Sequence, residues 1–352
     1  MARALEQVLN GDPELSQTRL RDFIASINRG EASYENGSVL DADGNLFDPS
    51  TQEDAISARP YIFQQANPYL SRQNCFQTGV DLLAQGNVKD SVMALEAEVQ
   101  KNAENADAWL TLGLAHAEND EDIKAIVALN RAVQMDPDNL DALLALGVSH
   151  TNELEQRQAL THLRTWLAKH PQYSSLVPPA SVEGAPAEFS TSYALQQQVV
   201  SMFEQAARAR PDDGEVHTVL GVLYNLCYEY PKAVEHFKEA LRVNPDDYAM
   251  WNKLGATLAN SMRSDEAIDA YIEGLKIKPN YVRALANLGI SYSNQELYDE
   301  AASCYLKALS MNPEASHIWS SLRVVFNCLN RPDLAQKTEL RNTEVFRGQF
   351  DF

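Results

Sequence analysis

The sequence repeats itself at a fixed spacing of 34 residues, and this spacing constrains the fold more than any other feature. Each repeat has a large anchor residue, and the anchors follow one another at Trp109, Leu143, His217, Trp251, Leu285 and Trp319. Neighbouring anchors are 34 residues apart except Leu143 and His217, which are 74 apart. The chain is therefore predicted to be a linear array of one structural unit, in which each repeat packs mainly on its neighbours.

Three more positions keep the same register. A glycine preceded by leucine stands four residues after most anchors, at Gly113, Gly147, Gly221, Gly255 and Gly289. An alanine and then a proline follow later in each repeat, as at Ala267 and Pro279. Small residues suit places where two helices cross closely, and proline ends the second helix. The pattern is typical of the tetratricopeptide repeat (TPR), so the sequence predicts an all-α TPR superhelix, an α-solenoid of about seven repeats.

One stretch breaks the register and divides the predicted array. Residues 174–192, SSLVPPASVEGAPAEFSTS, are rich in Pro, Ser, Gly and Ala and cannot sustain a helical period. We therefore expect residues 172–192 to be a hinge or insertion. It would join a pre-repeat segment and N-terminal TPR group at 60–171 to a C-terminal TPR group and helical segment at 193–352. Residues 1–59 have no repeat signal and are predicted to be polar and largely disordered.

Charge and composition exclude several classes of function. The chain carries 49 Asp and Glu against 29 Lys and Arg, a net charge of −20, so the phosphate backbone of a nucleic acid is an unsuitable partner. No apolar run is long enough to predict a membrane span. The four cysteines lack metal-ligand spacing and are expected to be reduced, mostly buried thiols. With no nucleophile, metal or phosphate motif, the chain is predicted not to be an enzyme and to need no cofactor.

Asparagines gather where a TPR array binds ligands, on the inner face formed by the first helix of each repeat. Asn252 and Asn287 fall inside predicted helices, where asparagine is a poor helix former, so contact with a ligand is favoured for both. Asn152, Asn260 and Asn294 fall near helix ends. For these three, ligand contact and left-handed helix capping are equally good interpretations. An amide both donates and accepts, which suits the backbone of an extended peptide.

Charged residues share this face. Lys253 and Arg283 are two cations in neighbouring repeats, where they would bind a terminal carboxylate or form ion pairs with nearby acids; composition leaves both alternatives open. Glu118, Asp120 and Asp122 form an acidic region at the end of a first helix. Such a region would favour a basic ligand side chain, although a run of this kind is more often a solvated loop.

Five strings resemble one family more closely than the repeat consensus requires. They are DYAMWNKLGATLANSMRSDEAI (Asp247–Ile268), YVRALANLGISYSNQ (Tyr281–Gln295), ALGVSHTNELEQ (Ala145–Gln156), VLGVLYNL (Val219–Leu226) and PYIFQQANPYL (Pro60–Leu70). These strings are similar to the TPR cargo-binding region of the peroxisomal import receptors that recognise type-1 targeting signals, C-terminal tripeptides such as Ser-Lys-Leu. The likeness runs from about residue 60 to the end of the chain, and the strings include inner-face residues that generic repeats leave variable.

The resemblance implies roles for single residues. In that family the residues matching the five asparagines hold the tripeptide backbone and carboxylate, and those matching Lys253 and Arg283 lie near the carboxylate. The residues matching Val148 and Thr151 line the cargo site. The family's C-terminal helices pack back against the array. The chain lacks any tryptophan before Trp109, and so lacks the W-x3-F/Y docking motifs that such receptors usually carry before their repeats.

The resemblance also implies a function. It implies a soluble cytoplasmic receptor that binds matrix proteins of the peroxisome and cycles to the peroxisomal membrane, where docking proteins are further partners. The alternative is a TPR co-chaperone adaptor that binds the C-terminal tails of chaperones. Because those tails are acidic, such an adaptor needs more cations on the inner face than Lys253 and Arg283.

Overall fold

The computed structural model describes residues 32–35, 38–41, 59–178, 192–350 and 352. The chain divides into two compact units, Met1–Pro60 and Tyr61–Phe352. In the first unit, strands β1 (Ala32–Glu35) and β2 (Ser38–Asp41) pair antiparallel. The hairpin was not predicted, although the sequence between the strands, Asn-Gly, is the strongest short hairpin signal.

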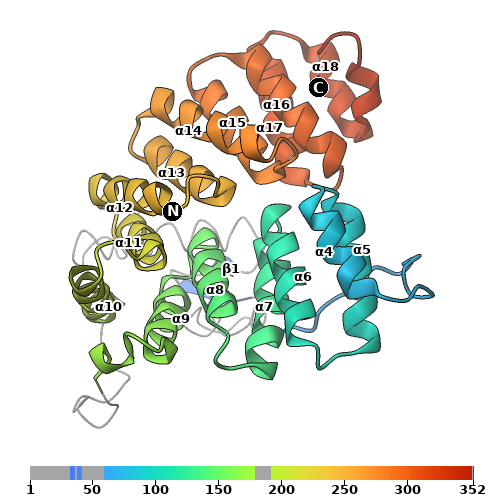
Figure 1. The fold of residues 1–352 in the computed structure, drawn as a ribbon. Coiled ribbons are helices and arrows are strands. Elements are labelled where there is room, and N and C mark those ends of the chain that lie inside the picture. The colour runs from blue at the N-terminus through green and yellow to red at the C-terminus, as the bar shows by residue number, and fades with distance from the viewer. Residues whose placement is uncertain (1–31, 36–37, 42–58, 179–191, 351) are drawn as a thin grey trace. The chain divides into compact units, whose positions relative to one another are not determined.

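The second unit is built from helices that pack on one another in chain order (Figure 1). The first six are α4 (Cys75–Ala84), α5 (Val88–Lys101), α6 (Ala106–Glu118), α7 (Asp122–Met135), α8 (Leu140–Asn152) and α9 (Gln156–Lys169). After the short helix η1 (Ser174–Leu176) follow α10 (Ser192–Ala209), α11 (Gly214–Leu226), α12 (Tyr230–Val243), α13 (Tyr248–Asn260) and α14 (Ser264–Ile277). The last are α15 (Val282–Asn294), α16 (Tyr298–Met311), α17 (Ser316–Cys328), α18 (Pro332–Lys337), η3 (Thr338–Leu340) and η4 (Thr343–Phe346). These helix pairs confirm the predicted TPR array.

The recurring glycine has the role that the repeat pattern predicts. A Cβ atom placed on Gly221 of α11 would lie 2.4 Å from Cε1 of Phe237 in α12, far inside van der Waals contact. Phe237 is 2% exposed, so its ring has no free space into which to move. The two helices of a repeat therefore approach each other over the glycine, and the partner's large side chain fills the space above it.

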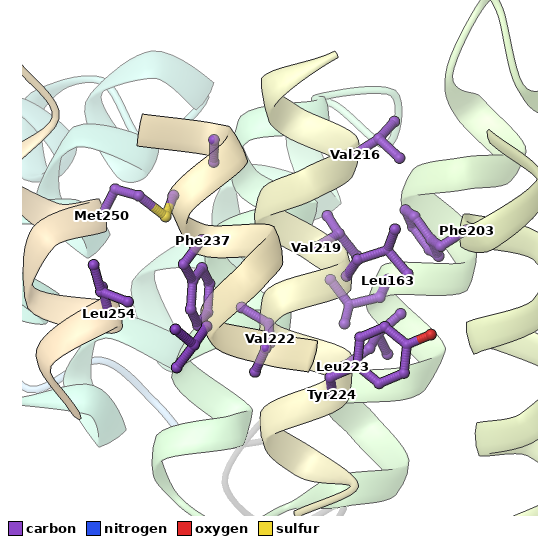
Figure 2. Packing of buried hydrophobic residues seen from close by; sticks show 14 of the residues in the cluster. Leu163, Phe203, Val216, Val219, Val222, Leu223, Tyr224, Phe237, Met250 and Leu254 are labelled. Carbon is purple, nitrogen blue, oxygen red and sulfur yellow. The ribbon is translucent and has the colours of Figure 1, made fainter. Parts of the chain in front are cut away.

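The hydrophobic core continues across the break in the repeat register. Trp166 of α9 is 1% exposed and stacks on the buried Phe203 of α10, with ring centroids 5.6 Å apart. Figure 2 shows the same cluster extending from Leu163 and Phe203 to Met250 and Leu254 of α13. Most of the predicted insertion, residues 179–191, lies outside the described residues. On either side of it, α9 and α10 pack directly against each other.

The C-terminal segment packs back on the array, as the resemblance implied. Phe346 of η4 is fully buried, and its ring stacks on Phe326 of α17 at a centroid distance of 5.3 Å. Phe350 contacts the same ring at 5.5 Å. Burying these aromatic side chains covers the end of the solenoid, which would otherwise expose an apolar face to water.

The four cysteines are free thiols with different exposure. Cys75 is buried, Cys227 and Cys304 are half-buried, and Cys328 is exposed, so the expectation of burial holds only in part. Among the residues that the structure describes, no helix has the length and apolarity needed to cross a membrane.

A left-handed residue recurs at the turn between the two helices of each repeat. These residues are Gly86, Asp120, Leu154, Tyr228, Met262, Glu296 and Asn330, with φ between 57° and 77°. They follow the repeat spacing, and all except Gly86 carry a Cβ atom. A left-handed conformation costs an L-residue about 1–2 kcal/mol, so each of these turns is held by the packing of the helices around it.

Glycine at one of these turns is expected to stabilise the protein. Met262 is 91% exposed, so Met262→Gly removes the left-handed strain without loss of packing. Because glycine also increases the entropy of the unfolded chain, the expected net gain is about 0.5–1 kcal/mol in urea denaturation. Met262→Ala is the matched control, since alanine keeps the Cβ atom that causes the strain. Equal stability of the two variants would contradict this explanation.

Candidate functional site

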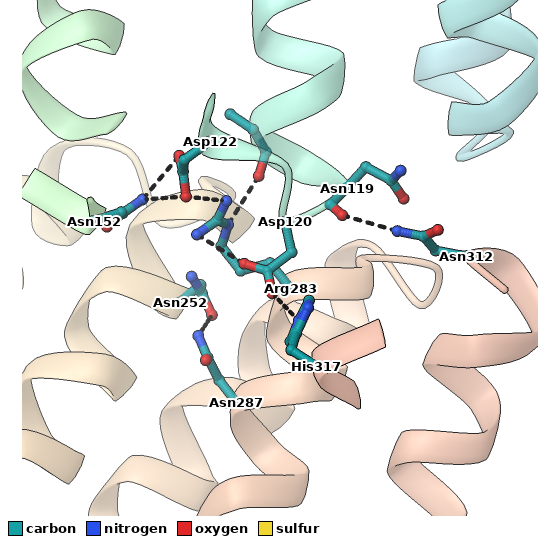
Figure 3. A network of polar contacts seen from close by, with 10 residues as sticks. Asn119, Asp120, Asp122, Asn152, Asn252, Arg283, Asn287, Asn312 and His317 are labelled. Atoms are coloured by element: carbon teal, nitrogen blue, oxygen red, sulfur yellow. Dashed lines mark hydrogen bonds and ion pairs between the residues drawn. The ribbon is translucent and has the colours of Figure 1, made fainter. Parts of the chain in front are cut away.

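The two mid-helix asparagines form a pair. Asn252 of α13 is 5% exposed, and its Oδ1 accepts a hydrogen bond of 3.0 Å from Nδ2 of Asn287 in α15. Figure 3 shows this pair; the Asn252 Nδ2 group and the Asn287 Oδ1 atom have no further partner among the described residues. One donor and one acceptor side by side match the C=O and N–H of a peptide backbone.

The three asparagines at helix ends are not left-handed caps. Asn152, Asn260 and Asn294 are the last residues of α8, α13 and α15, and the left-handed residue comes two positions later in each case. The capping alternative is therefore wrong for all three. Asn260 and Asn294 are exposed, and their side chains form no hydrogen bond with other described residues. Nδ2 of Asn152 lies 3.2 Å from both carboxylate oxygens of Asp122.

Arg283 of α15 is bound by groups from α6, α7 and the turn between them. Its Nε donates to the Ala117 carbonyl at 2.8 Å, Nη1 lies 3.0 Å from Asp120 Oδ1, and Nη2 donates to Asp122 Oδ2 at 2.7 Å. The side chain of Arg283 is only 12% exposed, and that of Asp122 is 6% exposed. We call Arg283, Ala117, Asp120 and Asp122 the clasp. The sequence left two roles open for Arg283, binding of a terminal carboxylate or an ion pair with nearby acids, and the structure contains the ion pair.

Opposite charge dominates the electrostatics of the clasp. Burial by itself would lower the pKa of the Arg283 guanidinium, but Asp122 and Asp120 raise it above its usual range. Burial would raise the pKa of the Asp120 carboxyl, but the hydrogen bond from His317 and the charge of Arg283 hold that pKa below its usual value. Both shifts favour the charged forms of Arg283 and Asp120.

The whole acidic region contacts helices far along the chain instead of forming a solvated loop. Its partners are Tyr248 and Lys278 for Glu118, Asn312 for the carbonyl of Asn119, and His317 for Asp120. The residues joined in this way are 130 to 197 positions apart. No local pattern marks such pairs, so reasoning from the sequence missed Tyr248, Lys278, Asn312 and His317.

A network of buried side chains binds Glu121, the residue between Asp120 and Asp122 of the acidic region. His116 of α6 is 1% exposed, and its Nδ1 lies 2.8 Å from Oε2 of Glu121. On its other side, Nε2 of His116 lies 2.5 Å from the Tyr61 hydroxyl, which donates to the buried Glu96 at 2.9 Å. Burial would raise the pKa of Glu121, but His116 and Lys124 lower it to about 2. The turn that carries Asp120 is thus held by Arg283 and His317 through Asp120, and by His116 through Glu121.

Lys253 differs from Arg283 in its contacts. It is half-buried on α13, and its Nζ forms neither a hydrogen bond nor an ion pair with another residue in the described ranges. Burial lowers the pKa of this ammonium group; Asp247 opposes the shift and Arg283 adds to it. A half-buried cation without a contacting anion favours binding of an anionic group from elsewhere.

The two remaining predicted residues lie on α8. Val148 packs partly buried against the main hydrophobic cluster, and the Thr151 hydroxyl donates to the Gly147 carbonyl at 2.7 Å. Their proximity to a ligand stays a prediction.

Comparison with known proteins gives relatives that align with half of the chain or more. Tetratricopeptide-repeat family models match residues 76–139, 229–282 and 282–314. The "Peroxisomal targeting signal 1 receptor" of Dictyostelium discoideum is 40% identical over 372 aligned residues, which cover 100% of this chain and 57% of the relative. "Peroxisome biogenesis protein 5" of Arabidopsis thaliana is 42% identical over 200 residues, covering 56% of this chain and 26% of the relative.

A third relative extends this similarity to another organism. The "Peroxisomal targeting signal receptor" of Yarrowia lipolytica is 38% identical over 180 residues, 50% of this chain and 30% of the relative. The chain thus spans between about a quarter and three fifths of the length of these curated relatives. Its helix pairs, repeat spacing and family matches show that the chain contains tetratricopeptide repeats, and it is similar over its whole length to the peroxisomal targeting signal 1 receptor of Dictyostelium discoideum.

Proposed function

We propose that this protein is a receptor for the C-terminal tripeptide, of the Ser-Lys-Leu type, of peroxisomal matrix proteins. The observation that carries the proposal is the half-buried Lys253, which has no partner among the described residues and directly follows Asn252 of the amide pair on α13. A cation next to backbone-matching amides suits the free end of a peptide. The names of the relatives support the same function and favour a receptor over an enzyme.

In this proposal the tripeptide lies along the inner face in extended form. Its carboxylate lies on the part of the inner face that carries Lys253 and Arg283. The amides of Asn252 and Asn287 bind its backbone from α13 and α15, and those of Asn152, Asn260 and Asn294 bind it from the helix ends. Val148 and Thr151 line the cargo site on α8. Burial of the ligand's leucine side chain would contribute about 1.5–3 kcal/mol.

The wider proposal concerns how the receptor works in the cell. It binds cargo in the cytoplasm with its N-terminal group (60–171) and C-terminal group (193–352), joined by residues 172–192, and cycles to docking proteins at the peroxisomal membrane. The relatives' role in peroxisomal targeting supports this cycle. The relatives do not favour the chaperone-tail adaptor, and Arg283, one of the two cations such an adaptor would use, is already paired with Asp120 and Asp122.

Amidating the peptide is expected to weaken binding about tenfold to a hundredfold, because a charge-assisted hydrogen bond contributes about 1.5–3 kcal/mol. Asn287→Ala removes one neutral hydrogen bond to the ligand and one to Asn252, so a loss of about threefold to tenfold is expected. Fluorescence anisotropy of a labelled peptide ending in Ser-Lys-Leu measures both effects.

The matched control is Asn130→Ala. Asn130 lies on α7, the second helix of its repeat, and should leave peptide affinity unchanged. An acidic chaperone-tail peptide serves as competitor and should not displace the labelled peptide. Equal binding of the free acid and the amide, or displacement by the acidic tail, would sink the proposed function.

A further inference from the structure

The segment Tyr61–Leu70, which precedes the first repeat, is bound to helix α5. The backbone N–H of Gln64 donates to Oε2 of Glu96 at 3.1 Å, and Nδ2 of Asn67 donates to the Met93 carbonyl at 2.7 Å. The segment also belongs to the same compact unit as the helices. We call Tyr61–Leu70 the strap. It is a folded part of the array although it carries no repeat signal.

The Tyr61 hydroxyl is the point at which the strap reaches α6. It has one hydrogen and two partners: it donates to Oε1 of Glu96 at 2.9 Å, and its oxygen lies 2.5 Å from Nε2 of His116. Glu96 and His116 are each 1% exposed. Because water reaches neither side chain, loss of the hydroxyl would leave two buried polar groups without this partner, which is unfavourable.

Glu96, Tyr61 and His116 share a proton. Burial, together with Glu96 and Glu121, raises the pKa of the Tyr61 hydroxyl, so the hydroxyl keeps its hydrogen. Since that hydrogen goes to Glu96, the contact with His116 needs a hydrogen on Nε2, and Nδ1 needs another to bind Glu121 at 2.8 Å. A neutral imidazole has only one N–H group, so the three groups together hold one additional proton. Hydrogen bonds therefore run without a break from the strap to Glu121.

Glu121 connects this chain of hydrogen bonds to the turn between α6 and α7. Its carboxylate binds His116 inside the same repeat. The preceding residue, Asp120, instead meets distant helices, with Arg283 of α15 at 3.0 Å and His317 of α17 at 2.8 Å. The position of Glu121 thus determines where Asp120 stands against α15 and α17.

We propose that Tyr61 is a positioning residue for the turn of residues 118–122, so that the strap controls the contact between the first repeats and the distant helices α15 and α17. Tyr61 acts through His116 and Glu121. The inference goes beyond the proposed function, because these contacts exist without a ligand; only the expected effect on peptide affinity rests on that function. A partner that drew the strap away from α5 would release the turn as loss of the hydroxyl does.

Tyr61→Phe in the full chain tests the proposal, because phenylalanine keeps the ring and removes only the hydroxyl. Hydrogen exchange at the amides of residues 118–122 is expected to become about tenfold faster, since the turn loses part of its support. Affinity for a labelled peptide ending in Ser-Lys-Leu is expected to fall about threefold to tenfold, because Asp122, at the end of this turn, binds Asn152 of the candidate site.

Tyr69→Phe is the matched control. Tyr69 lies in the same strap and is 7% exposed, but its hydroxyl forms no hydrogen bond with any residue in the described ranges. Exchange at residues 118–122 and peptide affinity should both match those of the wild type. The nitrogen NMR signals of the His116 ring should shift in Tyr61→Phe and stay unchanged in Tyr69→Phe, which separates loss of the hydrogen bond from a general loosening of the strap.

A double variant tests the route through Glu121. If Tyr61 acts by that route, Tyr61→Phe combined with Glu121→Ala should exchange at residues 118–122 no faster than Glu121→Ala alone, because both changes break one network. Unchanged exchange in Tyr61→Phe, or additive effects in the double variant, would overturn the inference. If the wild-type chain does not bind the peptide, the proposed function fails, while hydrogen exchange still decides the role of Tyr61.

Discussion

Replacing Trp166 with alanine is expected to lower the free energy of unfolding by about 3–5 kcal/mol, the range for truncating a buried tryptophan. Its side chain is 1% exposed and contacts the rings of Phe203, Tyr173 and His170. These contacts join α9 to α10 across the break in the repeat register. Because a solenoid transmits stability only between neighbouring units, a cavity at this junction weakens the link between the two halves of the array.

Urea denaturation followed by circular dichroism measures this effect. Tyr193→Ala is the matched control, because Tyr193 also lies at the junction, on α10, but is 60% exposed and should change stability by less than about 0.5 kcal/mol. The Trp166 variant is also expected to unfold in two transitions, one for each side of the junction. A loss below about 1 kcal/mol would show that the cores on either side do not depend on each other.

Replacing Glu121 with glutamine is expected to reduce stability at pH 7 by about 3 kcal/mol. The pKa of Glu121 falls from 4.5 to about 2 on folding, and each pKa unit corresponds to about 1.36 kcal/mol. Since the folded-state pKa is the lower one, the carboxylate stabilises the fold above pH 4.5. That stability is lost as the pH falls from 4.5 towards 2.

Stability measured against pH separates this effect from a simple packing defect. The wild-type chain should lose stability more steeply than Glu121→Gln between pH 4.5 and pH 2, so the two curves converge at acid pH. Glu239→Gln is a surface control, because Glu239 pairs with Arg242 in solvent and its removal should have no measurable effect. Parallel curves for wild type and Glu121→Gln would contradict the role given to His116 and Lys124.

The repeat architecture could be predicted because its signals are local. A glycine such as Gly221 and the large residue opposite it, Phe237, are sixteen positions apart, and the same spacing recurs along the chain. Each recurrence reports the same close crossing of two helices, so five matches in register determine the fold. The inner-face positions of Asn252 and Asn287 follow from the same register, and these two side chains do meet.

The clasp could not be predicted because its partners come from distant repeats. Arg283 and Asp122 are 161 positions apart, and no periodicity relates them. Small rotations in each repeat add up to the curvature of the array. This curvature determines which acids reach Arg283. The hairpin of residues 32–41 was missed for a different reason: its Asn-Gly signal is plain in the sequence, but it lies in a stretch whose polar composition suggested disorder.

The left-handed turns give the array one position per repeat whose side chain the fold does not specify. The backbone there is the same with an acid at Asp120, a tyrosine at Tyr228 and a methionine at Met262. A mutation at such a position therefore alters surface chemistry while leaving helix packing intact, for a conformational cost of about 1–2 kcal/mol at most. At Asp120 the turn residue is an acid that contacts Arg283, so there the side chain that the turn leaves free joins two distant repeats.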